Sequence, residues 1–177
     1  KMKLAEKFHL PIVTLIDTPG ANPDIGAEER GQAYAIAENI YEMCRLKTPI
    51  INIVIGEGGS GGALGIGIGD KFAILEYAYY SVISPEGCAA ILWKNSENAP
   101  EASESLRLTA KDLLKFGVVD EIISEPLGAA HKSPKAMANT LKSYILKYLE
   151  EIKSTPIDIL IENRYNKYRN IGKYLEC

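Results

Sequence analysis

Apolar and polar positions follow two periods along the chain, and their order predicts strands that alternate with helices. Two short apolar runs, residues 11–17 (PIVTLID) and 49–55 (PIINIVI), are typical of parallel strands buried on both faces. Between them, from Ala27 onward, apolar residues recur at helical spacing until the Thr48-Pro49 pair. The first part of the chain therefore predicts a strand, a helix and a second strand.

The later part of the chain shows the same mixture of periods. Residues 63–70 (ALGIGIGD) predict a short helix crowded by glycines, and residues 71–87 predict two strands, or one bent strand, before a helix that begins near Pro85. The elements predicted after it are a capped helix from Thr109 to Gly117, a strand over 118–124, a long amphipathic helix from Pro134 and a last helix over 158–174. This alternation predicts an α/β fold with mostly parallel pairing.

Composition narrows the class of protein without changing this picture. A chain of 177 residues, 46% hydrophobic and 24% charged, is typical of one soluble domain with a core. The net charge of -3 indicates no basic face for nucleic acid. Residues 163–174 (NRYNKYRNIGKY) are locally basic, and we interpret them as a surface helix or a partner contact. No apolar run approaches the roughly 20 residues of a membrane span.

Cysteine and histidine usage indicates neither disulfides nor a metal site. Cys44, Cys88 and Cys177 are far apart in the sequence, and His9 and His131 are the only histidines. This pattern lacks the spacing of a disulfide framework or of a zinc site, so we expect no metal. A reducing compartment suits such a chain, and we expect no signal peptide, which together predict a cytoplasmic location.

A glycine-rich stretch, residues 56–69 (GEGGSGGALGIGIG), follows the second predicted strand and carries the candidate chemistry. Its first part matches G-x-G-x-x-G, the loop of dinucleotide-binding folds, with Asp70 or Glu76 near the position of the ribose partner. The unit comes mid-chain, however, and the next helix would carry three glycines, each costing roughly 1 kcal/mol relative to alanine. Dinucleotide binding is therefore not the favoured interpretation.

Two further interpretations of this stretch remain. The pattern G-x-S-x-G around Ser60 is that of a hydrolase nucleophile, but it needs a later histidine, and His131 lies alone in a polar loop. Alternatively, the stretch is a set of backbone amides that opens a helix and stabilises negative charge on oxygen without an ionisable side chain. The possibility that its glycines only permit close packing stays open.

Residues 17–20 (DTPG) end the first predicted strand and form the second conspicuous motif. The same tetrapeptide occurs at the switch of many GTPases, where a backbone amide meets the γ-phosphate. The phosphate loop G-x-x-x-x-G-K-[ST] that such proteins also need is absent from this sequence. We interpret the motif as a tight turn at the end of a strand.

Several long segments, in the same order along the chain, closely resemble the carboxyltransferase alpha subunits of bacterial-type acetyl-CoA carboxylases. They are residues 10–21 (LPIVTLIDTPGA), 26–40 (GAEERGQAYAIAENI), 54–71 (VIGEGGSGGALGIGIGDK), 80–94 (YSVISPEGCAAILWK) and 125–134 (EPLGAAHKSP). Residues 108–123 also resemble the segment that closes the catalytic domain in the wider crotonase superfamily. The resemblance implies a crotonase-like (ClpP/crotonase) fold, a spiral of strand-strand-helix units with outer helices, over residues 1–177 as one carboxyltransferase domain.

The resemblance also implies an activity, a cofactor and partners. Members of the family that the chain resembles transfer a carboxyl group from carboxybiotin, held on a biotin carboxyl carrier protein, to acetyl-CoA. The product is malonyl-CoA, and the reaction is the first committed step of fatty acid biosynthesis. Biotin is then not attached to this chain. The implied partners are a carboxyltransferase beta subunit in an alpha2beta2 assembly, the carrier protein and biotin carboxylase, with the family's zinc site in the beta subunit.

The functional residues implied by the resemblance are mostly glycines. Catalytic roles fall to the amides of Gly61, Gly62 and Ala63, and substrate-binding roles to Gly58, Gly59, Gly87 and Cys88. The first three match the family's oxyanion turn, which faces biotin. Gly58 and Gly59 are expected to let the ligand approach. Gly87 and Cys88 are expected to open a second helix that supplies another hydrogen-bond donor. Ser60 then becomes a small loop residue.

Two departures from the family pattern accompany this likeness. Asn22-Pro23-Asp24 stands where the family usually has Tyr-Pro-Gly, which changes the rim of the expected pocket. Family members also carry over a hundred residues before this segment, and this chain starts inside a helical pattern, so we expect an N-terminal part to be missing. The alternatives are a carboxyltransferase or decarboxylase subunit for another acyl-CoA, and a non-catalytic assembly subunit.

Overall fold

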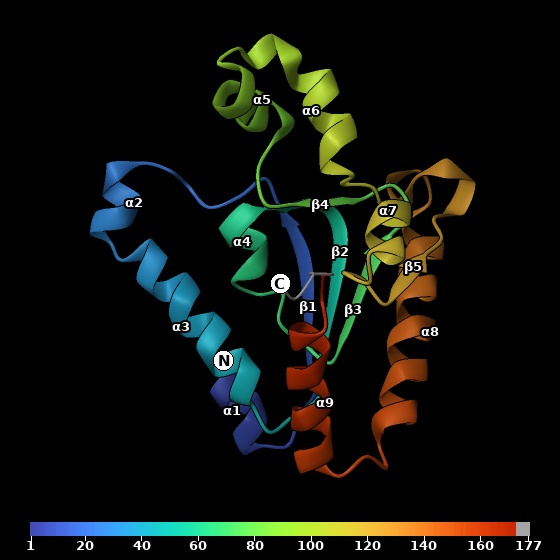
Figure 1. Cartoon of the computed structure of the whole chain (residues 1–177). Helices are drawn as coiled ribbons and strands as arrows, with labels where there is room; N and C mark the ends of the chain where they lie inside the picture. Colours follow the sequence, from blue (N-terminus) through green and yellow to red (C-terminus); the bar gives the residue numbers. More distant parts are fainter. Residues whose placement is uncertain (173–177) are drawn as a thin grey trace, which may run out of the picture.

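A parallel sheet forms the centre of the computed structural model, which describes residues 1–172 (Figure 1). Its main path runs in the order β1-β2-β3-β5, and β4 pairs with the far end of β2. The strands are β1 (Ile12–Thr18), β2 (Ile50–Gly59), β3 (Lys71–Leu75), β4 (Tyr79–Ser81) and β5 (Glu121–Ile123). All four strand pairings are parallel, which confirms the α/β prediction.

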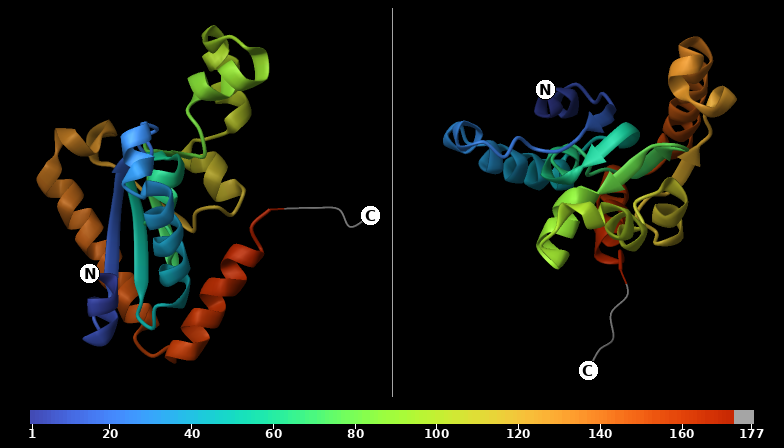
Figure 2. Two further views of the ribbon diagram at one scale, coloured as in Figure 1. Left: turned by 90° about the vertical axis from the view of Figure 1, so that its left-hand side faces the viewer. Right: turned by 90° about the horizontal axis from the view of Figure 1, so that it is seen from above.

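Helices surround this sheet on both faces. They are α1 (Met2–Lys7), α2 (Ile25–Glu29), α3 (Gln32–Arg45), α4 (Ser60–Leu64), α5 (Pro85–Trp93), α6 (Ala99–Leu106), α7 (Ala110–Lys115), α8 (Pro134–Ile152) and α9 (Ile157–Arg169), with single 3-10 turns over 96–98, 126–128 and 130–132. Figure 2 shows α8 and α9 on opposite faces of the sheet and α5 and α6 projecting away from it as an arm. Among the described residues, no helix is both long and apolar enough to span a bilayer.

The two long apolar strands are buried to different degrees. Five consecutive residues of β2, from Ile50 to Val54, are buried, as predicted. In β1, buried and exposed residues alternate instead, with Val13 and Leu15 exposed. The prediction that β1 is buried on both faces was therefore wrong, because β1 pairs only with β2 and turns one face toward a hollow beside α8.

Two helix predictions also needed correction. The helix expected from Ala27 onward is broken at Gly31, whose φ of 79° is left-handed, so that α2 and α3 are separate helices. The helix expected over 63–70 begins earlier, at Ser60, and ends at Leu64, because the later glycines form turns. Helix α6 was not predicted at all.

The local start and stop signals elsewhere are confirmed. Ser84 caps α5 by accepting the N–H of Gly87, and Thr109 caps α7 by accepting the N–H of Asp112. Gly117 follows α7 with a φ of +71°. Helix α9 ends at Arg169, and Tyr174 and Cys177 lie outside the described residues.

Two apolar clusters hold these elements together. The larger one lies around β2, β3 and β5 and takes in Met137, from the amphipathic face predicted for α8, and also Tyr144, which was not predicted. The smaller one joins Met43 and Leu46, at the end of α3, to Ile50 at the start of β2. Both clusters fix β2, so the glycine-rich stretch that follows it starts from a rigid strand.

Candidate functional site

The two motifs found in the sequence meet at the carboxyl ends of β1 and β2. We call residues 17–20 the DTPG turn and residues 58–63 the glycine turn. Thr18 pairs with Gly58 across the two strands, so the turns leave the sheet side by side (Figure 1). The carboxyl edge of a parallel sheet is where α/β proteins most often place a ligand. The structure thus brings both motifs together at the edge of the sheet where a ligand is expected.

The backbones of the two turns interlock. A Cβ built on Gly59 would collide with the carbonyl oxygen of Pro19, and one built on Gly62 would lie 2.8 Å from the carbonyl carbon of Gly20. Real Cβ atoms do not approach other atoms so closely, so neither position tolerates a side chain without a shift of the backbone. Close packing is therefore a certain role of these glycines.

The space beside Gly58 and Gly59 is filled by the chain itself. A Cβ on Gly58 would lie 2.7 Å from the ring of Tyr80, which belongs to the neighbouring strand β4. Gly59 faces Pro19 in the same way. In this structure the two glycines leave room for β4 and for the DTPG turn, and their role in the approach of a ligand stays a prediction.

The amides of the glycine turn point out of the start of α4. Ser60, Gly61 and Gly62 occupy the first three helical positions, whose N–H groups have no acceptor within an α-helix. No side chain of the described residues caps this end. Ala63, at the fourth position, is where the helical ladder of hydrogen bonds begins. Helical geometry therefore ranks Gly61 and Gly62 above Ala63 as free donors.

The second predicted pair of donors is already occupied. The N–H of Gly87 donates to Ser84 Oγ at 3.1 Å, and the N–H of Cys88 donates to the Ser84 carbonyl oxygen at 2.9 Å. Both amides are therefore bonded within the chain in this structure, and a donor role for this pair toward substrate stays a prediction. The signal was visible in the sequence, since a serine directly before Pro85 is a typical helix cap.

The structure also weighs against the rival interpretations of the glycine-rich stretch. Ser60 has a left-handed φ of 49° at a strand-to-helix turn, as a nucleophile would, yet no hydrogen bond among the described residues joins it to a histidine. His131 lies exposed in the 3-10 turn over 130–132. Asp70, the candidate ribose partner, is buried and already bonded to Arg164. Neither a catalytic pair nor a dinucleotide site is assembled.

Carboxylate and phenol groups border the turns on the β4 side. Asp17 Oδ1 accepts the N–H of Glu57 at 3.0 Å, and the Glu57 carboxylate accepts the hydroxyl of Tyr79 at 3.3 Å. Burial, and then the charge of Glu57, raise the pKa of Tyr79. Tyr79 therefore stays neutral at physiological pH and acts as a hydrogen-bond donor.

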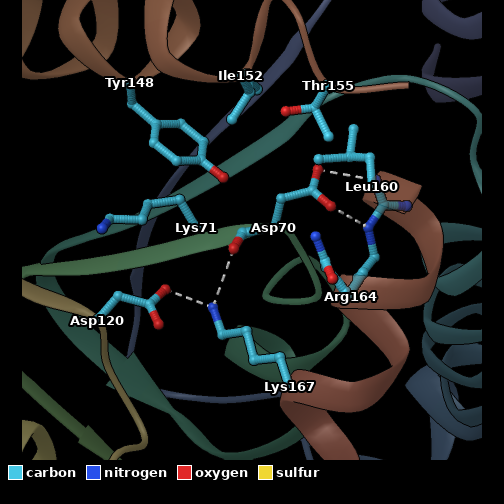
Figure 3. Close-up of a pocket in the computed structure, with 10 residues that line it drawn as sticks. Asp70, Lys71, Asp120, Tyr148, Ile152, Thr155, Leu160, Arg164 and Lys167 are labelled. Atoms are coloured by element: carbon cyan, nitrogen blue, oxygen red, sulfur yellow. Dashed lines mark hydrogen bonds and ion pairs between the residues drawn. The ribbon is translucent and has the colours of Figure 1, made fainter. Parts of the chain in front are cut away.

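A different, more charged region lies at the opposite end of the sheet (Figure 3). Here a hollow of about 400 Å³ opens between the starts of β3 and β5 and the helices α8 and α9. It is lined by Asp70, Lys71, Asp120, Tyr148, Arg164 and Lys167, among others. Its size and its ionisable groups are features that often mark a site, but it contains none of the predicted functional residues.

Four of the charged side chains that line this hollow form two pairs with each other. Arg164 is almost fully buried and binds Asp70 through two nitrogens, each at 2.8 Å from a carboxylate oxygen. It also donates to the carbonyl oxygens of Met43, Leu46 and Thr48. Lys167 pairs with Asp120, and burial lowers the pKa of Lys167. The interpretation of residues 163–174 as a surface helix was therefore wrong at Arg164, which anchors α9 to the fold.

A search for relatives gives one clear family. A family model described as acetyl co-enzyme A carboxylase carboxyltransferase-like matches residues 1–172. The acetyl-coenzyme A carboxylase carboxyl transferase subunit alpha of Rhodopirellula baltica is 58% identical over 176 residues, which are 99% of this chain and 55% of that protein. The same subunit of Geobacter sulfurreducens is 56% identical over 175 residues, again 99% and 55%. The chain thus spans about half the length of the curated relatives that it matches.

Solved structures of low sequence identity share the fold. A chain of the Pseudomonas malonate decarboxylase hetero-tetramer in complex with coenzyme A has a TM-score of 0.75 at 15% identity, covering 95% of this chain and 69% of that one. Transcarboxylase 12S has a TM-score of 0.64 at 21% identity, covering 82% and 29%. A probable enoyl-CoA hydratase from Mycobacterium smegmatis has a TM-score of 0.61 at 18% identity, covering 95% and 71%. The predicted crotonase-like fold is confirmed.

Proposed function

Because the chain belongs to the acetyl co-enzyme A carboxylase carboxyltransferase family, we propose that it contributes one half of a carboxyltransferase active site. The reaction moves a carboxyl group from carboxybiotin, carried on a biotin carboxyl carrier protein, to acetyl-CoA and gives malonyl-CoA. We further propose that residues 1–177 form a single carboxyltransferase domain. The observation that carries the proposal is the glycine turn, with free amides at the carboxyl edge of the sheet.

The donor set of the glycine turn fits this chemistry. Carboxybiotin supplies the carboxyl group when it is bound, and negative charge develops on carbonyl oxygens as that group is transferred. Backbone N–H groups stabilise such charge, and loss of one oxyanion donor typically costs about 3 kcal/mol in the barrier. Gly61, Gly62 and Ala63 are the proposed donors, with the first two favoured by their place in α4.

This chemistry places few demands on ionisable side chains. Two tyrosines border the turns among the described residues, and burial raises the pKa of both Tyr79 and Tyr80, so that both stay neutral. The turns therefore hold and orient oxygen atoms through backbone amides, and close packing keeps the amides in place. Ser60 needs no role as a nucleophile.

The proposed partners follow from the half-site. A carboxyltransferase beta subunit would supply the acyl-CoA contacts, a second oxyanion hole and the family's zinc site, in an alpha2beta2 assembly. The biotin carboxyl carrier protein would deliver its prosthetic group to the glycine turn, and biotin carboxylase would recharge it. We propose a cytoplasmic location for this complex, because the chain encodes no disulfide framework.

Malonyl-CoA formation in a reconstituted mixture tests the proposal. The chain is combined with a carboxyltransferase beta subunit, carboxylated carrier protein and acetyl-CoA, and each component is also assayed alone. The full-length Rhodopirellula baltica subunit, 58% identical over the shared region, is the positive control. We expect product only when alpha and beta chains are both present.

The acyl-CoA selected is tested in the same mixture. The decarboxylase and the transcarboxylase that share the fold make another acyl-CoA a rival substrate, and Asn22-Pro23-Asp24 alters the rim. A panel of acetyl-, propionyl- and malonyl-CoA separates these possibilities. Faster turnover of another acyl-CoA would overturn the acetyl-CoA assignment while preserving the reaction class.

A further inference from the structure

We propose that the DTPG turn is a positioning element, in which Asp17 and Thr18 hold the donor amides of the glycine turn at the place where charge develops. The inference rests on the proposed function for the reaction it serves. Neither residue has a reactive role in it: each acts through the backbone of its neighbours. The polar side chains of the motif thereby serve the reaction in addition to stabilising the turn itself.

Thr18 fixes the shape of the DTPG turn. Its hydroxyl accepts the N–H of Gly20 at 3.2 Å and donates to the carbonyl oxygen of the same residue at 3.1 Å. Both backbone polar groups of Gly20, which belong to successive peptide units, are thus tied to a single side chain at the end of strand β1. Gly20 adopts a φ of 144°, a conformation that side chains rarely accept. Without its hydroxyl, the Thr18 side chain would have no group left to hold Gly20 in this conformation.

Gly20 passes this constraint to the glycine turn. The ideal Cβ position of Gly62 lies 2.8 Å from the carbonyl carbon of Gly20 and 3.0 Å from the amide nitrogen of Ala21. The ideal Cβ position of Gly20 lies 3.5 Å from Ser60 Cβ. The two backbones therefore touch on both sides of the proposed donors. A change in Gly20 must move the amides of residues 61 and 62 or open a gap beside them.

Asp17 fixes the other end of the glycine turn. Its Oδ1 accepts the N–H of Glu57 at 3.0 Å, and the same carboxylate packs against Gly56, where a Cβ would press on it. This bond joins the end of β1 to β2 just before the glycine turn begins. Thr18 and Asp17 therefore constrain the turn from two directions, through contacts that need a hydroxyl and a hydrogen-bond acceptor respectively.

Substitutions at Thr18 test this role with a matched control. Thr18→Val keeps the shape and the β-branch of the side chain but removes both hydrogen bonds to Gly20, whereas Thr18→Ser keeps the hydroxyl. Each variant is made in a full-length alpha subunit and assembled with the beta subunit. The measured quantities are kcat, KM for the carboxylated carrier protein, and the melting temperature of the complex.

We expect Thr18→Val to lower kcat by about 10- to 100-fold with a much smaller change in KM, because a misplacement of about 1 Å can cost on the order of 100-fold in rate. Thr18→Ser should restore most of kcat. A merely structural hydroxyl would lower the melting temperature of Thr18→Val and leave kcat unchanged well below that temperature. Equal kcat values for the two variants would overturn the proposal.

A second pair of variants covers the case in which Thr18→Val fails to assemble. Asp17→Asn keeps an oxygen that can accept the N–H of Glu57, and Asp17→Ala does not. The same loss of kcat in Asp17→Ala, with rescue in Asp17→Asn, is expected. The proposed function and the positioning role fail in different ways. An inactive wild-type complex refutes the function. Full activity in Asp17→Ala refutes the positioning role alone.

Discussion

The two ends of the sheet show opposite ways of concentrating polar groups. At the amino end, around Asp70 and Arg164, ionised side chains crowd a hollow and neutralise one another (Figure 3). At the carboxyl end, around the DTPG and glycine turns, the chain presents backbone amides with hardly any side chains between them. The end with the hollow of about 400 Å³ and the paired charges is the one that we assign to stability.

The contrast between paired side-chain charges and unpaired backbone amides shows which kind of polar group indicates function in such a fold. Paired charges have few free donors or acceptors left for a ligand, whereas the first amides of a helix lack acceptors by geometry. A reaction that develops charge on oxygen needs the second kind of group. If the assignment is right, changes at the amino end should alter the free energy of unfolding, and changes at the carboxyl end should alter the rate.

The largest expected effect on stability is at Arg164. Replacing it with methionine leaves Asp70 buried without a counter-ion and leaves three carbonyl oxygens without their donor. Breaking a buried pair in this way typically costs about 3–5 kcal/mol. Urea unfolding of Arg164→Met should show this loss, and Lys153→Met, which removes an exposed ion pair with Glu150, should unfold like wild type. Equal unfolding of the two variants would contradict the anchoring role.

A smaller loss is expected from overpacking the two turns. Gly59→Ala places a Cβ against the carbonyl oxygen of Pro19, and strain of this kind typically costs about 1–3 kcal/mol. Gly61→Ala is the matched control for stability, since its Cβ would lie 3.5 Å from Ile36 Cδ1, an ordinary contact. Chemical unfolding of both variants should separate them. Similar stabilities would mean that the turns are less tightly interlocked than the contacts indicate.

The stability of the amino end of the sheet should depend on pH in the alkaline range, through Tyr168. Tyr168 donates to and accepts from backbone groups of Gly67 and Gly69, and burial raises its pKa above the ordinary value of 10. A raised folded pKa contributes stability that is fully present below pH 10 and is lost as pH rises above it, at about 1.4 kcal/mol per pH unit. Between pH 10 and 11, Tyr168→Phe should therefore lose stability less steeply than wild type. Parallel slopes would show that Tyr168 ionises freely in the folded protein.

The smallest effect is expected at Ser60. Ser60→Ala removes a hydroxyl that has no catalytic partner among the described residues, so carboxyl transfer should remain substantial. The assay is malonyl-CoA formation by the complex assembled with the beta subunit. Complete loss of transfer in a well-folded Ser60→Ala protein would instead favour the nucleophile that the G-x-S-x-G pattern indicates.

Local signals in the sequence predicted the features that depend on neighbouring residues. Helix α5 begins at Pro85 and Thr109 caps α7, both as predicted, and Gly117 follows α7 with the expected left-handed φ. The same local reasoning, applied more carefully to Ser84, would have shown that the amides of Gly87 and Cys88 are occupied.

Features set by residues distant in sequence were beyond such reasoning. Asp70 and Arg164 are 94 residues apart, and nothing near Arg164 in the sequence distinguishes it from Arg169, which is exposed. The exposure of Val13 likewise depends on β1 lying at the edge of the sheet. The proposed donors, the amides of Gly61, Gly62 and Ala63, were assigned from a family resemblance. The contact between Gly62 and the DTPG turn joins residues about 40 positions apart and is visible only in the structure.

The central claim is that the glycine turn serves the reaction as well as packing, and Gly62→Ala tests it most directly. The variant is assembled with the beta subunit, assembly is checked by sedimentation, and kcat is measured for the assembled complex alone. We predict a loss of about 100-fold or more, because the added Cβ, 2.8 Å from the carbonyl carbon of Gly20, must displace the donor amides. Wild-type kcat in an intact Gly62→Ala complex would contradict the claim and would reduce the glycines to packing residues.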